Sequence, residues 1–96
     1  MFIISVEYKK PLAEVDSHLP AHIEYLNAQY KAGNFLLSGR KKPRTGGIIL
    51  SNIGSKEDLD QIIKQGPFYH HQVADYHIIE FEPSMTSAGL EFLKNK

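Results

Sequence analysis

The sequence predicts a small α+β domain in which an antiparallel sheet carries its helices on one face. Two observations lead to this class. Four short segments are rich in β-branched and aromatic residues, and two longer segments between them show apolar residues at helical spacing. Glycine and proline punctuate the chain so that the elements follow in the order strand, helix, strand, strand, helix, strand.

The first strand is expected over residues 2–8, because β-branched and aromatic residues fill this segment and Lys-Lys-Pro closes it. Residues 11–16 stay open between a loop and a helical turn. The main helix is expected to start near Ser17 as N-cap, which leaves Pro20 in the first turn, where its missing N–H costs no hydrogen bond. Gly33 marks the end of this helix. The predicted apolar face consists of Leu19, Ile23, Leu26 and Tyr30.

The second and third strands are predicted in NFLLSGR (residues 34–40) and TGGIILSN (residues 45–52), with Lys-Lys-Pro-Arg as an exposed hairpin turn between them. A second helix follows. Ser55 is its expected N-cap, Asp58 occupies the N3 place of a capping box, and a Gly-Pro pair ends it.

The fourth strand is expected over residues 74–83, with His77 and Ile79 on one face and Tyr76 on the other. The resulting order, β-α-β-β-α-β, is that of the ferredoxin-like fold, an antiparallel sheet with helices on one face. Residues 1–96 are therefore predicted to form a single domain, with the tail 84–96 either peripheral or exchanged across a dimer.

The sheet is expected to have one uncovered apolar face. Both helices would cover the same side, yet the first and third strands carry apolar residues at neighbouring positions and so present them to both faces. Monomers rarely expose a large apolar patch. The simplest arrangement is a homodimer in which two sheets face each other across a two-fold axis.

The composition limits the classes of partner. Eleven basic and eleven acidic residues give a formal net charge of zero, which argues against nucleic acid or an anionic membrane. Cysteine is absent, which excludes thiolate metal sites and cysteine nucleophiles and fits the reducing cytoplasm. The first residues contain no apolar run long enough for a signal peptide or membrane span. The expectation is a cytoplasmic protein with a small-molecule ligand, and no motif implies a cofactor.

Two stretches of the sequence resemble a known family. They are LPAHIEYLNAQYKAGNFLLSGRKKPRTGGIIL and GPFYHHQVADYHIIEFEP, and they are similar to the YCII-related (YciI-like) family of small ferredoxin-like proteins over nearly the whole chain. The resemblance implies a dimeric α+β barrel with a cleft in each protomer, and an acid–base role for His22, often paired with an aspartate. Family members usually show Asp-Pro-Phe where this chain has Gly66-Pro67-Phe68, so a substitute such as Asp16 or Asp75 would be needed.

His22 is the first catalytic candidate on its own chemistry. An imidazole with an ordinary pKa near about 6.5 suits proton transfer at neutral pH, and the helix pattern puts it beside the apolar face. The alternative is a structural histidine at the helix–sheet seam. Asp75 either orients the imidazole or is a polar residue at a strand start. A metal site of His18 and His22 is disfavoured, because Leu19 replaces the glutamate that helical zinc sites carry there.

Substrate-binding candidates lie in and near the basic run RKKPRTGG. The run is either a solvated hairpin whose glycines relieve crowding against a neighbouring strand, or an anion site formed by Arg44 and the N–H groups of Gly46 and Gly47. Ser38 would orient the same ligand. Phe68 either covers a cleft or packs beneath the loop.

Two functions remain open at this stage. One is an acid–base enzyme that acts on a small organic molecule, with an anionic molecule as one version and His22 as the proton shuttle. The other is a non-catalytic module, dimeric, that binds a small ligand or assists another protein, and the glycine at position 66 favours it.

Overall fold

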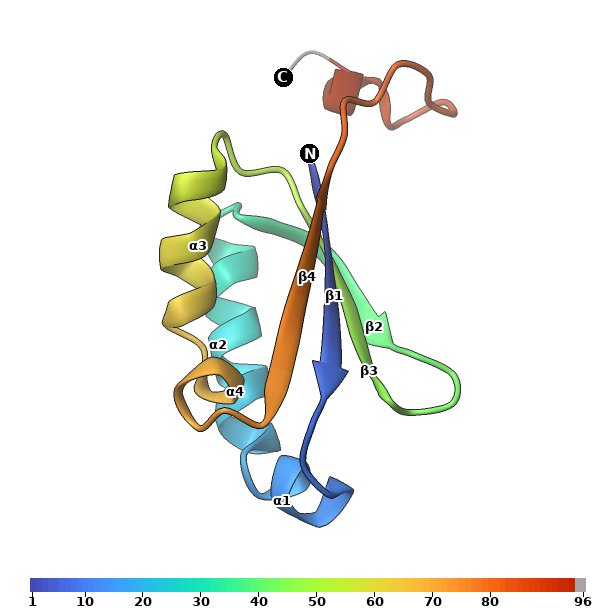
Figure 1. The fold of residues 1–96 in the computed structure, drawn as a ribbon. Coiled ribbons are helices and arrows are strands. Elements are labelled where there is room, and N and C mark those ends of the chain that lie inside the picture. The colour runs from blue at the N-terminus through green and yellow to red at the C-terminus, as the bar shows by residue number, and fades with distance from the viewer. Residues whose placement is uncertain (95–96) are drawn as a thin grey trace.

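A four-stranded antiparallel sheet forms the centre of the molecule, and the helices lie against one of its faces (Figure 1). The computed structural model describes residues 1–94. The elements in chain order are β1 (Phe2–Tyr8), α1 (Leu12–Ser17), α2 (Leu19–Lys31), β2 (Phe35–Arg40), β3 (Gly46–Ser51), α3 (Lys56–Lys64), α4 (Pro67–His70), β4 (Ala74–Glu80) and a 3-10 helix (Glu91–Lys94). The strand order β2, β3, β1, β4 confirms the predicted ferredoxin-like α+β class. Within residues 1–94, no helix has the length and apolar character needed to cross a membrane.

The buried face of the sheet follows from alternation along the strands. Phe2, Ile4 and Val6 of β1 are buried beneath the helices, because residues two apart in a strand share a face. Leu59 of α3 and Phe68 of α4 belong to the same core cluster. Each such side chain contributes about 1.5–3 kcal/mol when it leaves water, so this layer holds the helices on the sheet.

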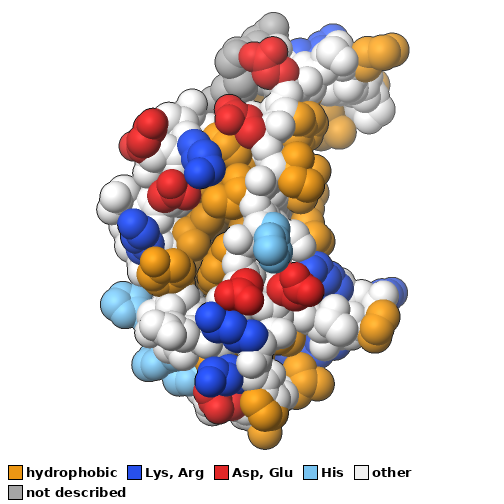
Figure 2. Space-filling view, in the orientation of Figure 1, with side chains coloured by type: hydrophobic (Ala, Val, Ile, Leu, Met, Phe, Trp, Pro, Cys, Tyr) orange, Lys and Arg blue, Asp and Glu red, His pale blue; other side chains and the backbone are white. Residues whose placement is uncertain are grey.

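The opposite face of the sheet is open and apolar. Ile3 of β1 lies beside Leu50 of β3 and Ile79 of β4, and Leu37 of β2 extends the row. The side chains of Leu37 and Ile79 are each 56% exposed. Figure 2 shows hydrophobic side chains along the side of the sheet that faces away from the helices. The prediction that strands carry apolar residues to both faces is therefore confirmed.

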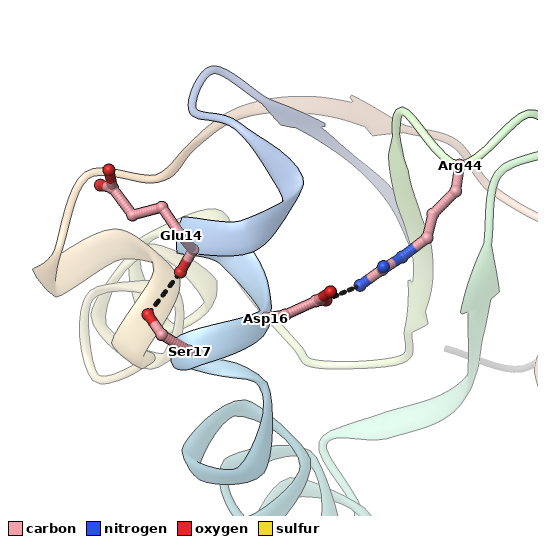
Figure 3. Close-up of polar contacts among 4 residues, drawn as sticks. All are labelled: Glu14, Asp16, Ser17 and Arg44. Carbon is pink, nitrogen blue, oxygen red and sulfur yellow. Dashed lines mark hydrogen bonds and ion pairs between the residues drawn. The ribbon is translucent and has the colours of Figure 1, made fainter.

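The start of the main helix differs from the prediction. The Ser17 hydroxyl donates a hydrogen bond of 2.6 Å to the Glu14 carbonyl oxygen, so Ser17 ends α1 instead of capping α2 (Figure 3). His18 takes the N-cap position of α2 and makes no side-chain cap hydrogen bond. Pro20 lies in the first turn as expected. The segment that the sequence left open between a loop and a helical turn thus forms a separate helix, α1. The Ser17 hydroxyl pairs with a carbonyl oxygen of that helix.

The other helix ends follow their sequence signals, with one addition. Gly33 adopts φ +78° directly after α2, a backbone conformation that glycine reaches without a steric penalty. The Ser55 hydroxyl accepts a hydrogen bond of 3.2 Å from the Asp58 N–H, which confirms the predicted cap of α3. The Gly-Pro pair after α3 was predicted only to end a helix, but it also begins α4, with Gly66 as an extended N-cap and Pro67 as the first helical residue.

The tail after β4 returns to the end of the sheet where β1 begins. The backbones of Met1 and Phe81 exchange two hydrogen bonds, of 3.0 and 2.9 Å, and Leu93 of the 3-10 helix is buried. The described part of the tail, residues 84–94, therefore contacts its own protomer, while exchange across a dimer stays a prediction. Residues 95–96 lie outside the described residues.

Candidate functional site

A cavity of about 170 Å³ lies between α2 and the end of the sheet where β1 and β2 finish and β3 begins. Leu19 and Leu26 of α2 and Ile49 of β3 give it apolar walls. Phe68 of α4 and His22 of α2 complete the wall on the helical side. A mostly apolar cavity with a few polar groups is the usual form of a small-molecule site.

His22 lies on the face of α2 that meets the sheet. It follows Leu19 by three residues and precedes Leu26 by four, and Gln29 continues the same buried face one turn later. Ile23 was predicted to belong to this face, but its side chain is 49% exposed at the cavity. The helix is thus rotated so that a histidine occupies a position that the apolar pattern assigned to isoleucine.

The His22 ring is covered by Phe68. The two rings are stacked, with centroids 3.9 Å apart and planes 6° apart. The His22 Nδ1 atom is enclosed and has no hydrogen-bond partner among the described residues. Burial lowers the pKa of His22 to about 4, because the charged ring would lose its water. The ring is neutral at pH 7.

Ser38 lies on the cavity wall opposite α2. Its position in β2 is beside Ile49 of β3, on the face that the helices cover. The hydroxyl groups of Ser38 and Tyr30 form a hydrogen bond, and either oxygen is a competent donor. The predicted site residue therefore reaches the cavity, with a second hydroxyl fixing its orientation.

The glycines at the start of β3 are explained by strand packing. A Cβ atom at Gly46 would lie 1.8 Å from the carbonyl oxygen of Val6, a distance that no side chain tolerates. A Cβ atom at Gly47 would lie 2.9 Å from the carbonyl oxygen of Gly39. Both glycines line the cavity, and the geometry supports the reading in which they relieve crowding between strands.

Arg44 is occupied by an ion pair outside the cavity wall. Its Nη2 atom donates to the Asp16 carboxylate at 2.5 Å, as Figure 3 shows, and its guanidinium lies 5.8 Å from the centre of the Tyr8 ring. The hydrogen bond from Arg44 lowers the pKa of Asp16. Arg44 therefore ties the β2–β3 hairpin to α1, and neither Arg44 nor Asp16 lines the cavity.

Asp75 lies on the other side of the sheet from His22. It pairs in register with Glu7, which shares the open face with Ser5 and Ile3, two and four positions earlier in β1. The Asp75 carboxylate contacts the Lys9 ammonium at 3.2 Å. The structure does not bring Asp75 to the imidazole. The position could have been inferred from the alternation of β4, in which Asp75 shares a face with His77.

Gly66, where the family resemblance implied an aspartate, faces an aromatic ring. A Cβ atom at Gly66 would lie 3.2 Å from the Tyr25 ring. The Tyr25 hydroxyl donates a hydrogen bond of 2.8 Å to the Ile62 carbonyl oxygen, which holds that ring in place. The space beside Gly66 is therefore taken by the Tyr25 ring.

His18, the N-cap of α2, and His22, one turn later, contact different aromatic rings. His18 stacks on His71, with ring centroids 4.0 Å apart, whereas His22 stacks on Phe68. Within residues 1–94, no group of three His, Asp or Glu side chains is placed to hold a metal ion.

Five of the predicted site residues line the cavity, together with one polar residue that the sequence analysis did not select. His22, Ser38, Gly46, Gly47 and Phe68 all line it. The additional residue is Arg40, the last residue of β2, which also lines it. Strand alternation was the signal that would have found it, since residues two apart in a strand share a face and Ser38 was already a candidate.

Residues 1–82 match the YCII-related domain, so the chain belongs to the YCII-related domain family. Among solved structures, the fold is similar to that of 5-chloro-2-hydroxyhydroquinone dehydrochlorinase (TftG) from Burkholderia phenoliruptrix AC1100 in complex with 2,5-dihydroxybenzoquinone. The TM-score is 0.71 with 15% sequence identity, over 85% of this chain and 94% of that chain, and the likeness concerns the fold. No curated protein sequence matches the chain.

Proposed function

We propose that the His22 cavity binds a compact organic molecule and that His22 transfers a proton to or from it. The observation that supports this most is a neutral imidazole in the wall of a cavity that holds one ring. A protein cavity of about 150 Å³ accommodates benzene, so about 170 Å³ suits a single-ring compound. The dehydrochlorinase with the similar fold was solved with a ligand of that kind.

The state of His22 defines the direction of the first proton transfer. Its Nδ1 atom is enclosed, so a ligand reaches the ring through Nε2. A neutral imidazole whose hydrogen is on Nδ1 accepts a proton there. With a pKa of about 4 the ring is a weak base in the empty cavity, and a general base works best when its pKa is near the working pH. A bound anion within about 4–6 Å stabilises the imidazolium and raises this pKa, so an anionic substrate would activate its own base.

A second function, non-catalytic binding of the same kind of molecule, is favoured by one observation. Within residues 1–94, no carboxylate accepts a hydrogen bond from the His22 Nδ1 atom, and Tyr25 fills the space beside Gly66. In this version the cavity holds a ligand without converting it. A ligand then raises the melting temperature by mass action and is recovered unchanged.

Ring-sized acids and phenols incubated with the wild type, His22→Asn and His70→Asn separate the two functions. His70 is exposed and does not line the cavity, so it is the matched control. The acid–base proposal expects conversion by the wild type and His70→Asn, and a loss of about 10²–10⁴-fold in His22→Asn. Conversion that survives in His22→Asn would overturn it. Ligands that shift the melting temperature but stay intact would favour binding alone.

The proposal includes a homodimer formed through the open sheet face. Support comes from the row of Ile3, Leu37, Leu50 and Ile79, which is larger and more continuous than the isolated apolar side chains of most monomer surfaces. A two-fold axis would place the same row on both partners. A cytoplasmic location and the absence of a nucleic-acid partner remain part of this proposal, on the neutral charge balance of the sequence.

A further inference from the structure

Arg40 points to the cavity from the last position of β2. It lies beside Gly47 of β3, and alternation gives its side chain the same face as Ser38. Gly47 has no side chain to compete for that space. Arg40 is among the residues that line the cavity.

Arg40 is the one residue of the described cavity wall with a full charge at neutral pH. The rest of the wall is apolar, glycine or hydroxyl-bearing, apart from His22, which burial keeps neutral. No carboxylate within residues 1–94 forms an ion pair with Arg40. A guanidinium beside apolar walls and without a partner has donors to offer to an incoming anion.

Asp16, Arg44 and Arg40 together carry a surplus of one positive charge. Asp16 is neutralised by Arg44 through their hydrogen bond, and the more distant charge of Arg40 lowers the pKa of Asp16 to a lesser degree. Arg40 is therefore close enough to act on Asp16 electrostatically but is not bonded to it. Two guanidinium groups act on one carboxylate, so their combined net charge of +1 suits a ligand with a single negative charge.

We propose that Arg40 binds the carboxylate of a single-ring organic acid whose ring fills the apolar part of the His22 cavity. The inference rests on the proposed function and names the class of its ligand. The guanidinium fork matches a planar carboxylate with two parallel N–H donors, whereas a point charge such as lysine does not. Arg40, and not Arg44, would then set the preference for an anion.

The test compares benzoate with benzamide, which has nearly the same shape and no charge. Dissociation constants are measured by titration followed in NMR spectra, with the signals of His22, Ile23 and Phe68 as reporters of the cavity. The variants are Arg40→Gln, Arg40→Lys and, as a control, Lys42→Gln, which removes an exposed positive charge of the same hairpin. We expect the wild type to bind benzoate about 10- to 100-fold more tightly than benzamide, as a charge-assisted pair predicts. Arg40→Gln should abolish this preference, Arg40→Lys should keep part of it, and Lys42→Gln should keep it.

The possible failures are distinguishable. Equal affinity of the wild type for benzoate and benzamide, with both shifting the cavity signals, would overturn the role of Arg40 and leave the proposed function standing. Equal losses in Arg40→Gln and Lys42→Gln would also overturn it, because a general surface charge would then explain the preference. If neither compound shifts the cavity signals, both the inference and the proposed function are wrong. Arg40 is exposed, so Arg40→Gln is expected to fold, and an unchanged melting temperature verifies this.

Discussion

The imidazole of His22 lies flat against the phenyl ring of Phe68, with 3.9 Å between ring centroids and 6° between ring planes. Phe68 is 1% exposed, so this contact closes one face of the imidazole to water. His22 is also among the residues that line the cavity. A ligand can change the pKa of a titratable group that is partly desolvated and lies in the wall of a cavity.

The stability of the protein should depend on pH through His22. Its pKa is about 4 in the folded protein and about 6.5 in an unfolded chain, so the unfolded state binds more protons between these values. The stabilising contribution is complete above about pH 6.5 and is lost as the pH falls to about 4. The loss should be on the order of 2 kcal/mol, after allowance for the partly exposed ring.

Urea unfolding of the wild type and His22→Asn at several pH values measures this contribution. The remaining histidines are common to both proteins, so the difference between the two curves isolates position 22. The difference in unfolding free energy should change between pH 6.5 and pH 4 and stay constant above pH 7. Parallel curves across this range would show that the ring is not desolvated.

Gly66 should tolerate a methyl group less well than Gly54. A Cβ atom at Gly66 meets the Tyr25 ring at 3.2 Å and the Ile63 carbonyl oxygen at 3.4 Å, whereas Gly54 has nothing within 4 Å. Gly66→Ala should lower the free energy of unfolding by about 1–3 kcal/mol through overpacking. Gly54→Ala should be neutral or stabilising by up to about 1 kcal/mol, since it reduces the entropy of the unfolded chain. Chemical denaturation checks both, and equal effects would contradict the tight contact with Tyr25.

A charge on the open sheet face should separate the proposed dimer. Ile79→Lys places an ammonium at the β4 end of the apolar row, where a partner sheet would have to desolvate it. Sedimentation of the wild type should give the dimer mass, and Ile79→Lys should give the monomer mass at micromolar concentration. Gln61→Lys, which adds the same charge on the exposed side of α3, should remain a dimer. A wild type that sediments as a monomer at high concentration would remove the dimer from the proposal.

Loss of the Arg44 contact should be visible at Asp16 and not in the cavity. The Arg44 hydrogen bond is the main cause of the low pKa of Asp16. Arg44→Gln should therefore raise that pKa toward its ordinary range, as measured by carboxyl carbon shifts in an NMR titration. Lys42→Gln should leave it unchanged. A pKa of Asp16 that does not respond to Arg44→Gln would mean that the ion pair does not persist in solution.

Local patterns in the sequence predicted the fold well, because short-range chemistry fixes its elements. Alternation in β1 separates Ile4 from Ile3, and the Ser55 cap and Gly33 define helix ends within a few residues. The short helix after Gly66 was missed because Gly-Pro serves both to stop one helix and to start another.

Some of the predicted site residues line the cavity, and the positions that differ from expectation depend on contacts distant in sequence. His22 and Ser38 reach the cavity because their own helix and strand determine the faces that they occupy. Arg44 was predicted to bind an anion because the neighbouring sequence gives no sign that it pairs with Asp16, which is 28 residues away. Strand alternation places Arg40 on the same face as Ser38, but only the fold shows that Asp16 pairs with Arg44 and not with Arg40.

The close approach of Gly46 to β1 affects how any genetic screen of this cavity has to be interpreted. Because the Val6 carbonyl oxygen fills the space of a Cβ atom, a saturation library should lose every replacement at position 46, whatever molecule the screen supplies. Depletion there reports on folding alone. Ser38 and Arg40, whose side chains meet no such backbone obstacle, are the positions at which enrichment or depletion would report on the ligand.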